Sequence, residues 1–232
     1  MSEVSESGTA GSGRHAASPD LVDVPEHHPI TERTVLHHGR VWDVVREAFT
    51  YGDGTIIREV VDHPGAVAIL ALDDDDRMLL IRQYRHPVRQ RDWEIPAGLL
   101  DMAGEPPLTA AQRELGEEAD LAATDWSVLA EFLNSPGGSS ETIRVYLARG
   151  LSALPAFERH DEEADIEVAW APLDEVVAAV LARRVQSPSL VVGALAAAAA
   201  RARGWSSLGA GTEPWVRHPR LGEPPWAVPR DA

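Results

Sequence analysis

The chain has 232 residues, of which 44% are hydrophobic and 25% charged, a composition typical of one globular domain with appendages. All 21 basic residues are arginine and no residue is cysteine, which excludes lysine Schiff-base chemistry, cysteine nucleophiles, disulfides and thiolate zinc sites. The formal net charge of −16 disfavours nucleic acid and membranes as partners, so an anionic substrate needs a local positive patch or a metal ion.

The N-terminal MSEVSESGTAGSG lacks the basic-then-apolar layout of a signal peptide. The longest apolar run, around residues 190–200, is shorter than the ~20 residues that cross a bilayer. We therefore expect a soluble, cytoplasmic protein.

Residues 1–28 are rich in Ser, Gly, Ala, His and acids without periodicity, which predicts a disordered tail. Strands are expected over TVLHHG, RVWDVVREAFTY and TIIREVVDH, with a turn at YGDGT. The continuous apolar run GAVAILALD predicts a strand buried on both faces, and RMLLIRQYR predicts its neighbour. Between these two strands, DDDD is interpreted as a solvated loop tip rather than a metal site.

WEIPAG ends a further short strand, and Pro106 and Pro107 mark the start of a helix that runs to Leu121. Strands follow at WSVLAEFLN, ETIRVYLARGL and IEVAWAPL, then helices over 172–184 and 190–203, then a Trp/Pro-rich tail over 205–232. This order predicts an α+β fold with a mixed sheet, rather than regular βαβ units. Neither GxGxxG nor GxxxxGK[ST] occurs.

The stretch RELGEEADL crowds charges onto the central helix. Residues three and four apart on a helix are neighbours, so Glu114, Glu117 and Glu118 project from one side and Arg113 can pair with Glu117. One interpretation is a solvated acidic face held by an Arg–Glu pair. The other is a site for a hard divalent cation such as Mg²⁺, which relieves the repulsion between carboxylates.

Residues 98–121, GLLDMAGEPPLTAAQRELGEEADL, resemble the Nudix box, the signature of the Nudix hydrolases. Two departures from the motif are visible. Six residues instead of five separate Gly98 from Glu105, and Asp120 replaces the second glycine of the motif. The resemblance implies a Nudix fold, a mixed β-sheet sandwiched between helices (α/β/α), over 29–204. Residues 29–62 are expected to form an N-terminal antiparallel strand region.

The resemblance also implies a ligand set and a cofactor. Glu114 and Glu118 would be the main Mg²⁺ ligands, Glu117 would assist, and the backbone carbonyl of Ala97 would complete the site, with Mn²⁺ as a substitute metal. Arg113 would orient the glutamates. These residues serve hydrolysis of a nucleoside diphosphate linked to another group.

Outside the box, three segments resemble the ADP-ribose pyrophosphatase subfamily: QYRHPVRQRDWEIPAGLL, SPGGSSE and EEADIEV. The third resembles an acidic loop that places a catalytic glutamate over the metals. Such a carboxylate accepts a proton from the attacking water. Its position favours Glu162, with Glu163 as the near alternative, and an ordinary acidic loop remains a further interpretation.

Five residues are candidates for substrate binding, each with a structural alternative. Arg85 and Arg58 suit a charge-assisted grip on a diphosphate, or surface salt bridges. Trp42 suits stacking on adenine, or a place in a core or interface. Gly138 lets the backbone approach a ligand, or simply turns a hairpin, and Glu141 reaches the metal shell or the ribose.

The leading hypothesis is Mg²⁺-dependent hydrolysis of ADP-ribose to AMP and ribose 5-phosphate. The alternatives are another nucleoside diphosphate sugar or a dinucleotide as substrate, or a Nudix-like sensor that binds ADP-ribose without cleaving it. The intact Arg113, Glu114, Glu117 and Glu118 argue against the sensor, since a protein that only binds has no need of the full metal set. The resemblance further suggests a homodimer whose N-terminal strands contribute to the partner's substrate site.

Overall fold

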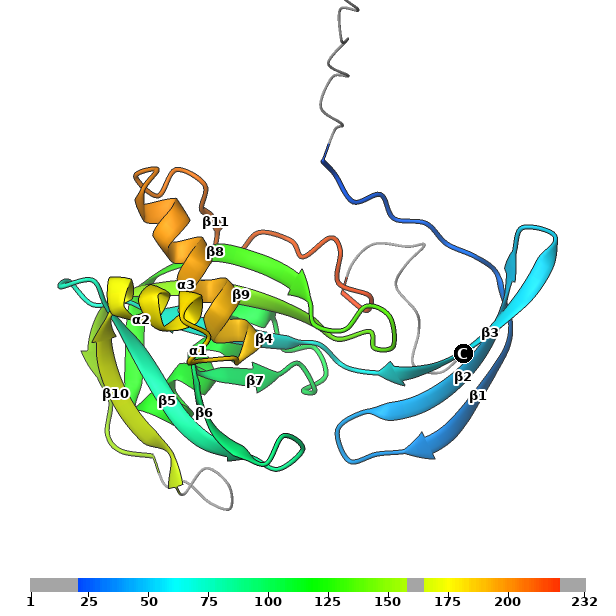
Figure 1. Cartoon of the computed structure of the whole chain (residues 1–232), viewed down its shortest axis with the longest axis horizontal. Helices are drawn as coiled ribbons and strands as arrows, with labels where there is room; N and C mark the ends of the chain where they lie inside the picture. Colours follow the sequence, from blue (N-terminus) through cyan, green and yellow to red (C-terminus); the bar gives the residue numbers. More distant parts are fainter. Residues whose placement is uncertain (1–20, 158–164, 222–232) are drawn as a thin grey trace, which may run out of the picture.

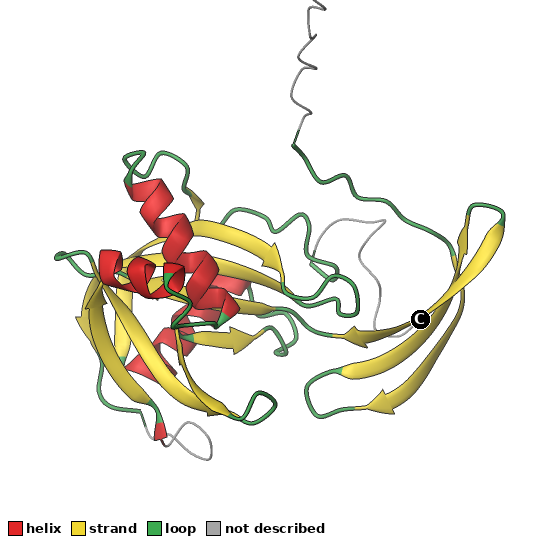
Figure 2. Ribbon diagram, in the orientation of Figure 1, coloured by secondary structure: helices red, strands yellow, loops and turns green. Residues whose placement is uncertain are grey.

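The computed structural model describes residues 21–157 and 165–221. Two sheets and three helices form a main body, and a three-stranded sheet projects from it (Figure 1, Figure 2). The strands are β1 (Ile30–His38), β2 (Asp43–Tyr51), β3 (Gly54–Asp62), β4 (Ala66–Ala71), β5 (Arg77–Arg85), β6 (Gln90–Glu94), β7 (Ala97–Leu99), β8 (Leu121–Leu133), β9 (Thr142–Ala153), β10 (Glu167–Pro172) and β11 (Gly209–Ala210). The helices are α1 (Pro107–Ala119), α2 (Leu173–Leu181) and α3 (Pro188–Arg201). No described helix is long and apolar enough to cross a membrane.

The main body is built on a five-stranded sheet in the order β11-β8-β9-β4-β7. Strands β4 and β9 pair in parallel, whereas β4–β7 and β8–β9 pair antiparallel, so the sheet is mixed, as predicted. A second sheet, β10-β5-β6, is antiparallel throughout. All six residues of β4 are buried, which places this strand in the interior of the main body.

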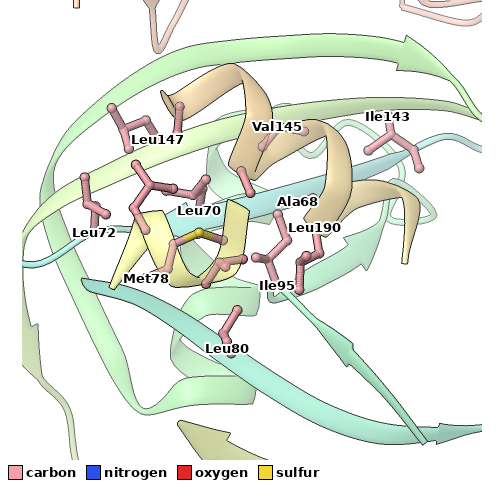
Figure 3. Packing of buried hydrophobic residues seen from close by; sticks show 14 of the residues in the cluster. Ala68, Leu70, Leu72, Met78, Leu80, Ile95, Ile143, Val145, Leu147 and Leu190 are labelled. Carbon is pink, nitrogen blue, oxygen red and sulfur yellow. The ribbon is translucent and has the colours of Figure 1, made fainter. Parts of the chain in front are cut away.

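Alternate residues of β4 face two different cores. Val67, Ile69 and Ala71 pack with the apolar face of α1, whereas Ala68 and Leu70 pack with residues of α2 and α3. Figure 3 shows this second cluster, with Leu70, Val145 and Leu190 pointing toward one another. A strand covered on both faces needs apolar residues at every position, which is why GAVAILALD has no alternation. The α/β/α sandwich is therefore confirmed.

The helix α1 begins with a proline in its first turn and ends at Asp120, which has a left-handed conformation with φ 54° and ψ 37°. A non-glycine residue there costs about 1 kcal/mol. The carboxylate offsets this cost, since Asp120 Oδ1 accepts a hydrogen bond from the Phe157 backbone N–H at 2.7 Å. Its backbone carbonyl accepts a second bond from Leu154 N–H at 2.8 Å. Aspartate at this position thus binds the segment that follows β9.

The extra residue before Glu105 is absorbed in a tight turn. The Glu105 backbone N–H donates to the Met102 carbonyl at 3.1 Å, and Gly104 has a φ of 79°, a conformation that glycine adopts without strain. The turn precedes the helix, so the spacing between Glu105 and Arg113 is unchanged.

The N-terminal sheet, formed by β1, β2 and β3, is covered by none of the helices in the described part of the chain (Figure 1). Val45 is its one buried residue, aligned with Val35 and Val60 on its neighbours. The sheet is fastened to the main body where β3 ends, by hydrogen bonds from Val61 N–H to the Gly138 carbonyl at 2.9 Å and from Ser140 N–H to the Val61 carbonyl at 3.0 Å.

The segment that follows α3 packs onto the main body. Arg144 of β9, only 1% exposed, donates to the carbonyls of Glu213 and Pro214, and its guanidinium lies 4.8 Å from the centre of the Trp215 ring. Trp215 is buried as a result. Most of the N-terminal segment for which disorder is predicted, residues 1–20 of 1–28, lies outside the described residues. Residues 222–232 of the C-terminal tail lie outside them as well.

Candidate active site

Arg113 forms ion pairs with three glutamates in and next to α1. Its Nε and Nη2 donate to the two carboxylate oxygens of Glu105, each at 3.1 Å. Its Nη1 donates to Glu114 Oε1 at 2.6 Å and to Glu117 Oε2 at 2.9 Å. These hydrogen bonds, that to Glu105 foremost, raise the pKa of Arg113, so the guanidinium is permanently charged. One cation thereby fixes three glutamates, two on the helix and one at its entrance.

The other face of the charged cluster meets β7. Glu118 is 6% exposed, and its Oε2 accepts a hydrogen bond from the Ala97 backbone N–H at 2.9 Å. Glu114 lies directly against Gly98, where an added Cβ would stand 2.0 Å from the Glu114 carboxyl carbon. Only glycine allows this approach, which explains the glycine that opens the box.

The predicted metal ligands are close to one another but are held by protein donors. Among residues 21–157 and 165–221, no group of three or more His, Asp or Glu side chains is arranged to hold a metal ion. Glu114 and Glu117 contact Arg113, and Glu118 contacts Ala97. The donor set is nevertheless the oxygen-rich kind that a hard divalent cation prefers.

A pocket of about 840 Å³ opens on the far side of Ala97 and Gly98, between the N-terminal sheet and the main body. We call it the junction pocket. Its lining includes Trp42, Val61, His63, Arg85, Glu94, Ala97, Gly98, Asn134, Ser135, Gly138, Ser139, Glu141 and residues 187–189. The box glutamates 114 and 118 therefore lie directly behind one wall of a pocket large enough for a nucleotide.

Arg85 projects into the junction pocket from the end of β5. Its Nε and Nη2 donate to the two oxygens of Glu94 at 2.8 and 2.7 Å, a two-point geometry that fixes the guanidinium plane. Glu94 is 7% exposed, whereas the Arg85 side chain is 42% exposed. The salt bridge considered from sequence is present, but it lies in the pocket wall and leaves part of the cation accessible.

The SPGGSSE segment, residues 135–141, forms another part of the pocket lining. The Glu141 side chain is 23% exposed, and its Oε2 accepts a hydrogen bond from Asn134 Nδ2 at 2.8 Å. A Cβ added at Gly138 would meet no atom within 4 Å, so the glycine leaves open space beside the pocket rather than relieving a clash within the chain.

The two candidates from the N-terminal region, Trp42 just before β2 and Arg58 on β3, have different positions. Trp42 lines the junction pocket and is 42% exposed, so it is not a core residue of its own chain. Arg58 is exposed on β3, where its Nη1 donates to the Ile57 carbonyl at 2.9 Å, and it is not among the residues that line the pocket. The structure thus brings Trp42, Arg85, Gly138 and Glu141 together and leaves Arg58 apart. Glu162 and Glu163 lie outside the described residues.

Sequence reasoning missed Glu94, His63 and Asn134, all of which line the pocket. Glu94 is part of the WEIPAG segment and follows a tryptophan, where it looks like an ordinary strand residue. His63 is part of DHPG, between two strands, and Asn134 precedes SPGG. Their pairing with Arg85 and Glu141 depends on strand register and loop closure, which no local pattern shows.

A second hollow of about 850 Å³ lies between the loop at residues 100–109 and the C-terminal segment at 211–215. It is lined by Glu105, but by none of the residues expected to bind the metal or the substrate. The junction pocket is the better candidate for the chemistry of the box, because Ala97, Arg85 and Glu141 line it and Gly98 in its wall contacts Glu114.

Comparison with known proteins agrees with this geometry. Residues 62–190 match the family model of the NUDIX domain. The chain is 45% identical over 162 residues to the ADP-ribose pyrophosphatase of Mycobacterium tuberculosis, covering 69% of this chain and 78% of that protein. It is 35% identical over 161 residues to the ADP-ribose pyrophosphatase of Bacillus subtilis, covering 67% and 86% respectively.

A solved structure described as an ADP compounds hydrolase shares the fold, with a TM-score of 0.62 and 22% sequence identity over 79% of this chain and 99% of the other. The match to the family model begins at the end of β3 and spans the box, the junction-pocket loops and α2. The chain belongs to the Nudix family, and it is similar to the ADP-ribose pyrophosphatases within it.

Proposed function

We propose that this protein hydrolyses the diphosphate of ADP-ribose to AMP and ribose 5-phosphate. The observation that carries the proposal is the contact of Glu114 with Gly98. It sets the charged face of α1 directly behind a pocket lined by Arg85, Trp42 and Glu141. The similarity to two ADP-ribose pyrophosphatases supports this choice of substrate.

The pocket residues divide the recognition of such a substrate. Arg85, with its plane fixed by Glu94, binds a diphosphate oxygen through the accessible part of its guanidinium. Trp42 offers an aromatic face to adenine. Glu141, an acceptor, suits the hydroxyl groups of ribose, and Gly138 leaves room for the ligand beside the loop.

The metal expected in a Nudix hydrolase fits the residues present. Glu114 and Glu118, assisted by Glu117 and the Ala97 carbonyl, would hold Mg²⁺, with Mn²⁺ as a substitute. When bound, the ion screens the diphosphate charge and lowers the pKa of water. Arg113 holds Glu114 and Glu117 on one side of α1, which keeps their carboxylates near the pocket wall.

The reaction consumes one water molecule. A new bond forms between the water oxygen and one phosphorus, and the bond from that phosphorus to the bridging oxygen breaks. The bridging oxygen leaves with the second phosphate. We assign removal of the water proton to Glu162, or to Glu163, because their segment EEADIEV resembles the loop that carries a catalytic glutamate in the ADP-ribose pyrophosphatase subfamily.

We further propose a homodimer in which the N-terminal sheet reaches the partner's pocket. Apolar side chains on this sheet stay exposed in one chain, among them Val35 at 40% and Ile57 at 59%, and contiguous exposed apolar surface is typical of an interface. Arg58, which is apart from its own pocket, would then act in the partner's. The expected setting is the cytoplasm, with no nucleic acid and no membrane as partner.

The test of the reaction is product analysis with purified protein, ADP-ribose and Mg²⁺. We expect AMP and ribose 5-phosphate by anion-exchange chromatography, and a loss of about 1,000-fold in kcat for Glu118→Gln, since a lost metal ligand removes several kcal/mol of transition-state stabilisation. Glu175→Gln, an exposed carboxylate on α2, is the matched control and should keep full activity. Equal activity of Glu118→Gln and wild type would contradict the proposal.

The choice of substrate is tested by comparing kcat/KM for ADP-ribose, other nucleoside diphosphate sugars and a diadenosine diphosphate. ADP-ribose should have the highest value. A higher value for another compound assigns that substrate instead, and ADP-ribose binding measured by calorimetry without any AMP formation would indicate a sensor.

The partner contribution of Arg58 is tested by mixing two inactive variants, Arg58→Ala and Glu118→Gln, under conditions that exchange subunits. If Arg58 acts in the partner's site, mixed dimers contain one intact site and activity returns to roughly a quarter of the wild-type value. If Arg58 acts in its own chain, no activity returns. A monomer mass by light scattering would also remove the proposal.

A further inference from the structure

His63 occupies the joint between the N-terminal sheet and the main body, directly after β3. Its backbone N–H donates to Ser140 Oγ at 2.9 Å, and its side chain is 9% exposed in the lining of the junction pocket. Figure 1 shows that β3 passes into β4 through this joint. The ring thus reaches the pocket from the same short connection that joins the two parts of the molecule.

The hydrogen bonds of the ring determine where its proton lies. Nδ1 accepts a hydrogen bond from the Gly65 backbone N–H at 3.1 Å, so the proton of the neutral ring is on Nε2. Burial lowers the pKa of His63, and the nearby charge of Glu141 opposes this effect. The other charged groups that act on the ring are Arg220, which lowers its pKa, and Asp62, which raises it.

The protonated nitrogen faces Glu141. The distance from His63 Nε2 to Glu141 Oε1 is 4.0 Å, beyond a direct hydrogen bond but within range of attraction between an N–H dipole and a carboxylate. The other oxygen, Oε2, accepts the 2.8 Å bond from Asn134. The carboxylate therefore accepts a direct hydrogen bond from Asn134 at Oε2, and its Oε1 faces the N–H of His63.

This arrangement does not suit His63 as a general base. The Nδ1 lone pair is already used by Gly65, and Nε2 carries the proton, so the neutral ring has no lone pair for a proton from water. Its remaining function is to donate toward the carboxylate that it faces.

We propose that His63 is a positioning residue that holds the Glu141 carboxylate in the orientation in which it accepts hydrogen bonds from the ribose hydroxyl groups of the substrate. The inference rests on the proposed function, because it requires a ribose-containing substrate in the junction pocket. It adds that the joint after β3 sets the geometry of that contact.

The kinetic test is a double-mutant cycle of His63→Leu and Glu141→Gln. Alone, His63→Leu should raise KM for ADP-ribose about 10-fold and change kcat by less than about 3-fold, because it disturbs binding rather than the chemical step. In the Glu141→Gln background, the same substitution should have no further effect. His63→Gln, which keeps an N–H donor, should recover part of the lost affinity. Equal effects of His63→Leu in both backgrounds would overturn the inference and indicate a general structural role.

An independent test uses the nitrogen-15 resonances of the histidine ring and needs neither activity nor a histidine variant. We expect the Nε2–H form in the wild type and a lower His63 pKa in Glu141→Gln, since the charge that raises it is removed. The Nδ1–H form, or an unchanged pKa, would overturn the inference while leaving the proposed reaction intact. A wild type that forms no AMP from ADP-ribose would instead overturn the proposed reaction, whatever the ring resonances show.

Discussion

The two parts of the molecule that are joined at His63, the main body and the N-terminal sheet, differ sharply in burial. All six residues of β4 are buried, whereas eight of the nine residues of β1 are exposed and the ninth is half-buried. Both regions contain valine, isoleucine and leucine. The difference arises because β4 lies between α1 on one face and α3 on the other, while no helix among the described residues packs on the N-terminal sheet.

The contrast in burial means that the two regions contribute differently to folding stability and to the lining of the pocket. Hydrophobic stabilisation scales with the apolar area removed from water, so the main body accounts for most of the free energy of folding. The N-terminal sheet adds little of that area, yet it supplies Trp42, Val61 and the approach to His63 in the junction pocket. The pocket therefore has one firmly packed wall and one wall carried by a lightly packed sheet.

The largest expected effect tests this contrast directly. Leu70→Ala should lower the free energy of unfolding by about 2–5 kcal/mol, because the side chain is fully buried and its loss leaves a cavity. Ile57→Ala, at a side chain 59% exposed, should cost less than about 0.5 kcal/mol in the monomer. Urea denaturation measures both. A cost at Ile57 that grows with protein concentration would show that a second copy covers the sheet.

The second prediction concerns the contact between Gly98 of β7 and Glu114 of α1. Gly98→Ala places a Cβ 2.0 Å from the Glu114 carboxyl carbon, so the carboxylate or β7 must move. We expect kcat/KM to fall about 100-fold, since displacement of a catalytic group by about 1 Å has a cost of this size. The matched control is Gly116→Ala, on the helix that carries Glu114. A Cβ added there would stand no closer than 3.5 Å to its nearest neighbour, so this variant should retain activity. Similar rates for Gly98→Ala and wild type would contradict the proposed role of the contact.

A third effect concerns His218, which packs under the joint between the two regions. A Cβ at Gly65 would stand 2.3 Å from its Nε2, and its Nδ1 accepts hydrogen bonds from the backbone N–H groups of Arg220 and Leu221. Burial, and then the charge of Arg220, lower the pKa of His218 to about 4. In the unfolded chain the pKa is near 6.5, so the unfolded state binds more protons between these values.

Stability from this group is therefore complete above about pH 6.5 and is lost as the pH falls toward 4. Between pH 7 and 4.5 we expect the wild type to lose about 2–3 kcal/mol more than His218→Asn, in which the amide oxygen can still accept a backbone hydrogen bond. Urea denaturation of both proteins at the two pH values gives the difference, in which carboxylate titration largely cancels. Parallel pH profiles of the two proteins would mean that the pKa of His218 is not lowered in the folded state.

Much of the fold was predictable because its signals are local. The uniform apolar run at β4, the proline-marked start of α1 and the alternating strands each depend on a few neighbouring residues. The helical spacing likewise predicted that Arg113 pairs with Glu117, and the structure has this ion pair at 2.9 Å. The catalytic role of Arg113 stays a prediction.

The pairing of Glu94 with Arg85 and of His63 with Glu141 was not predictable. These pairs join residues 9 and 78 positions apart in the chain, and they form only after strand register and loop closure bring them together. A charged residue in a strand and a histidine in a turn have many roles, and sequence alone does not choose among them.

The smallest effect tests the one position where the box departs from its usual residue. Asp120 combines a left-handed backbone, which glycine would relieve, with a carboxylate that accepts the Phe157 N–H bond, which glycine would lose. Each contribution is about 1 kcal/mol, so Asp120→Gly should change the free energy of unfolding by less than about 0.5 kcal/mol. Asp120→Ala keeps the left-handed strain and loses the hydrogen bond, so it should cost about 1 kcal/mol by urea denaturation. Equal costs for the two variants would mean that the helix does not end in the left-handed conformation, and that the aspartate is retained for its hydrogen bond alone.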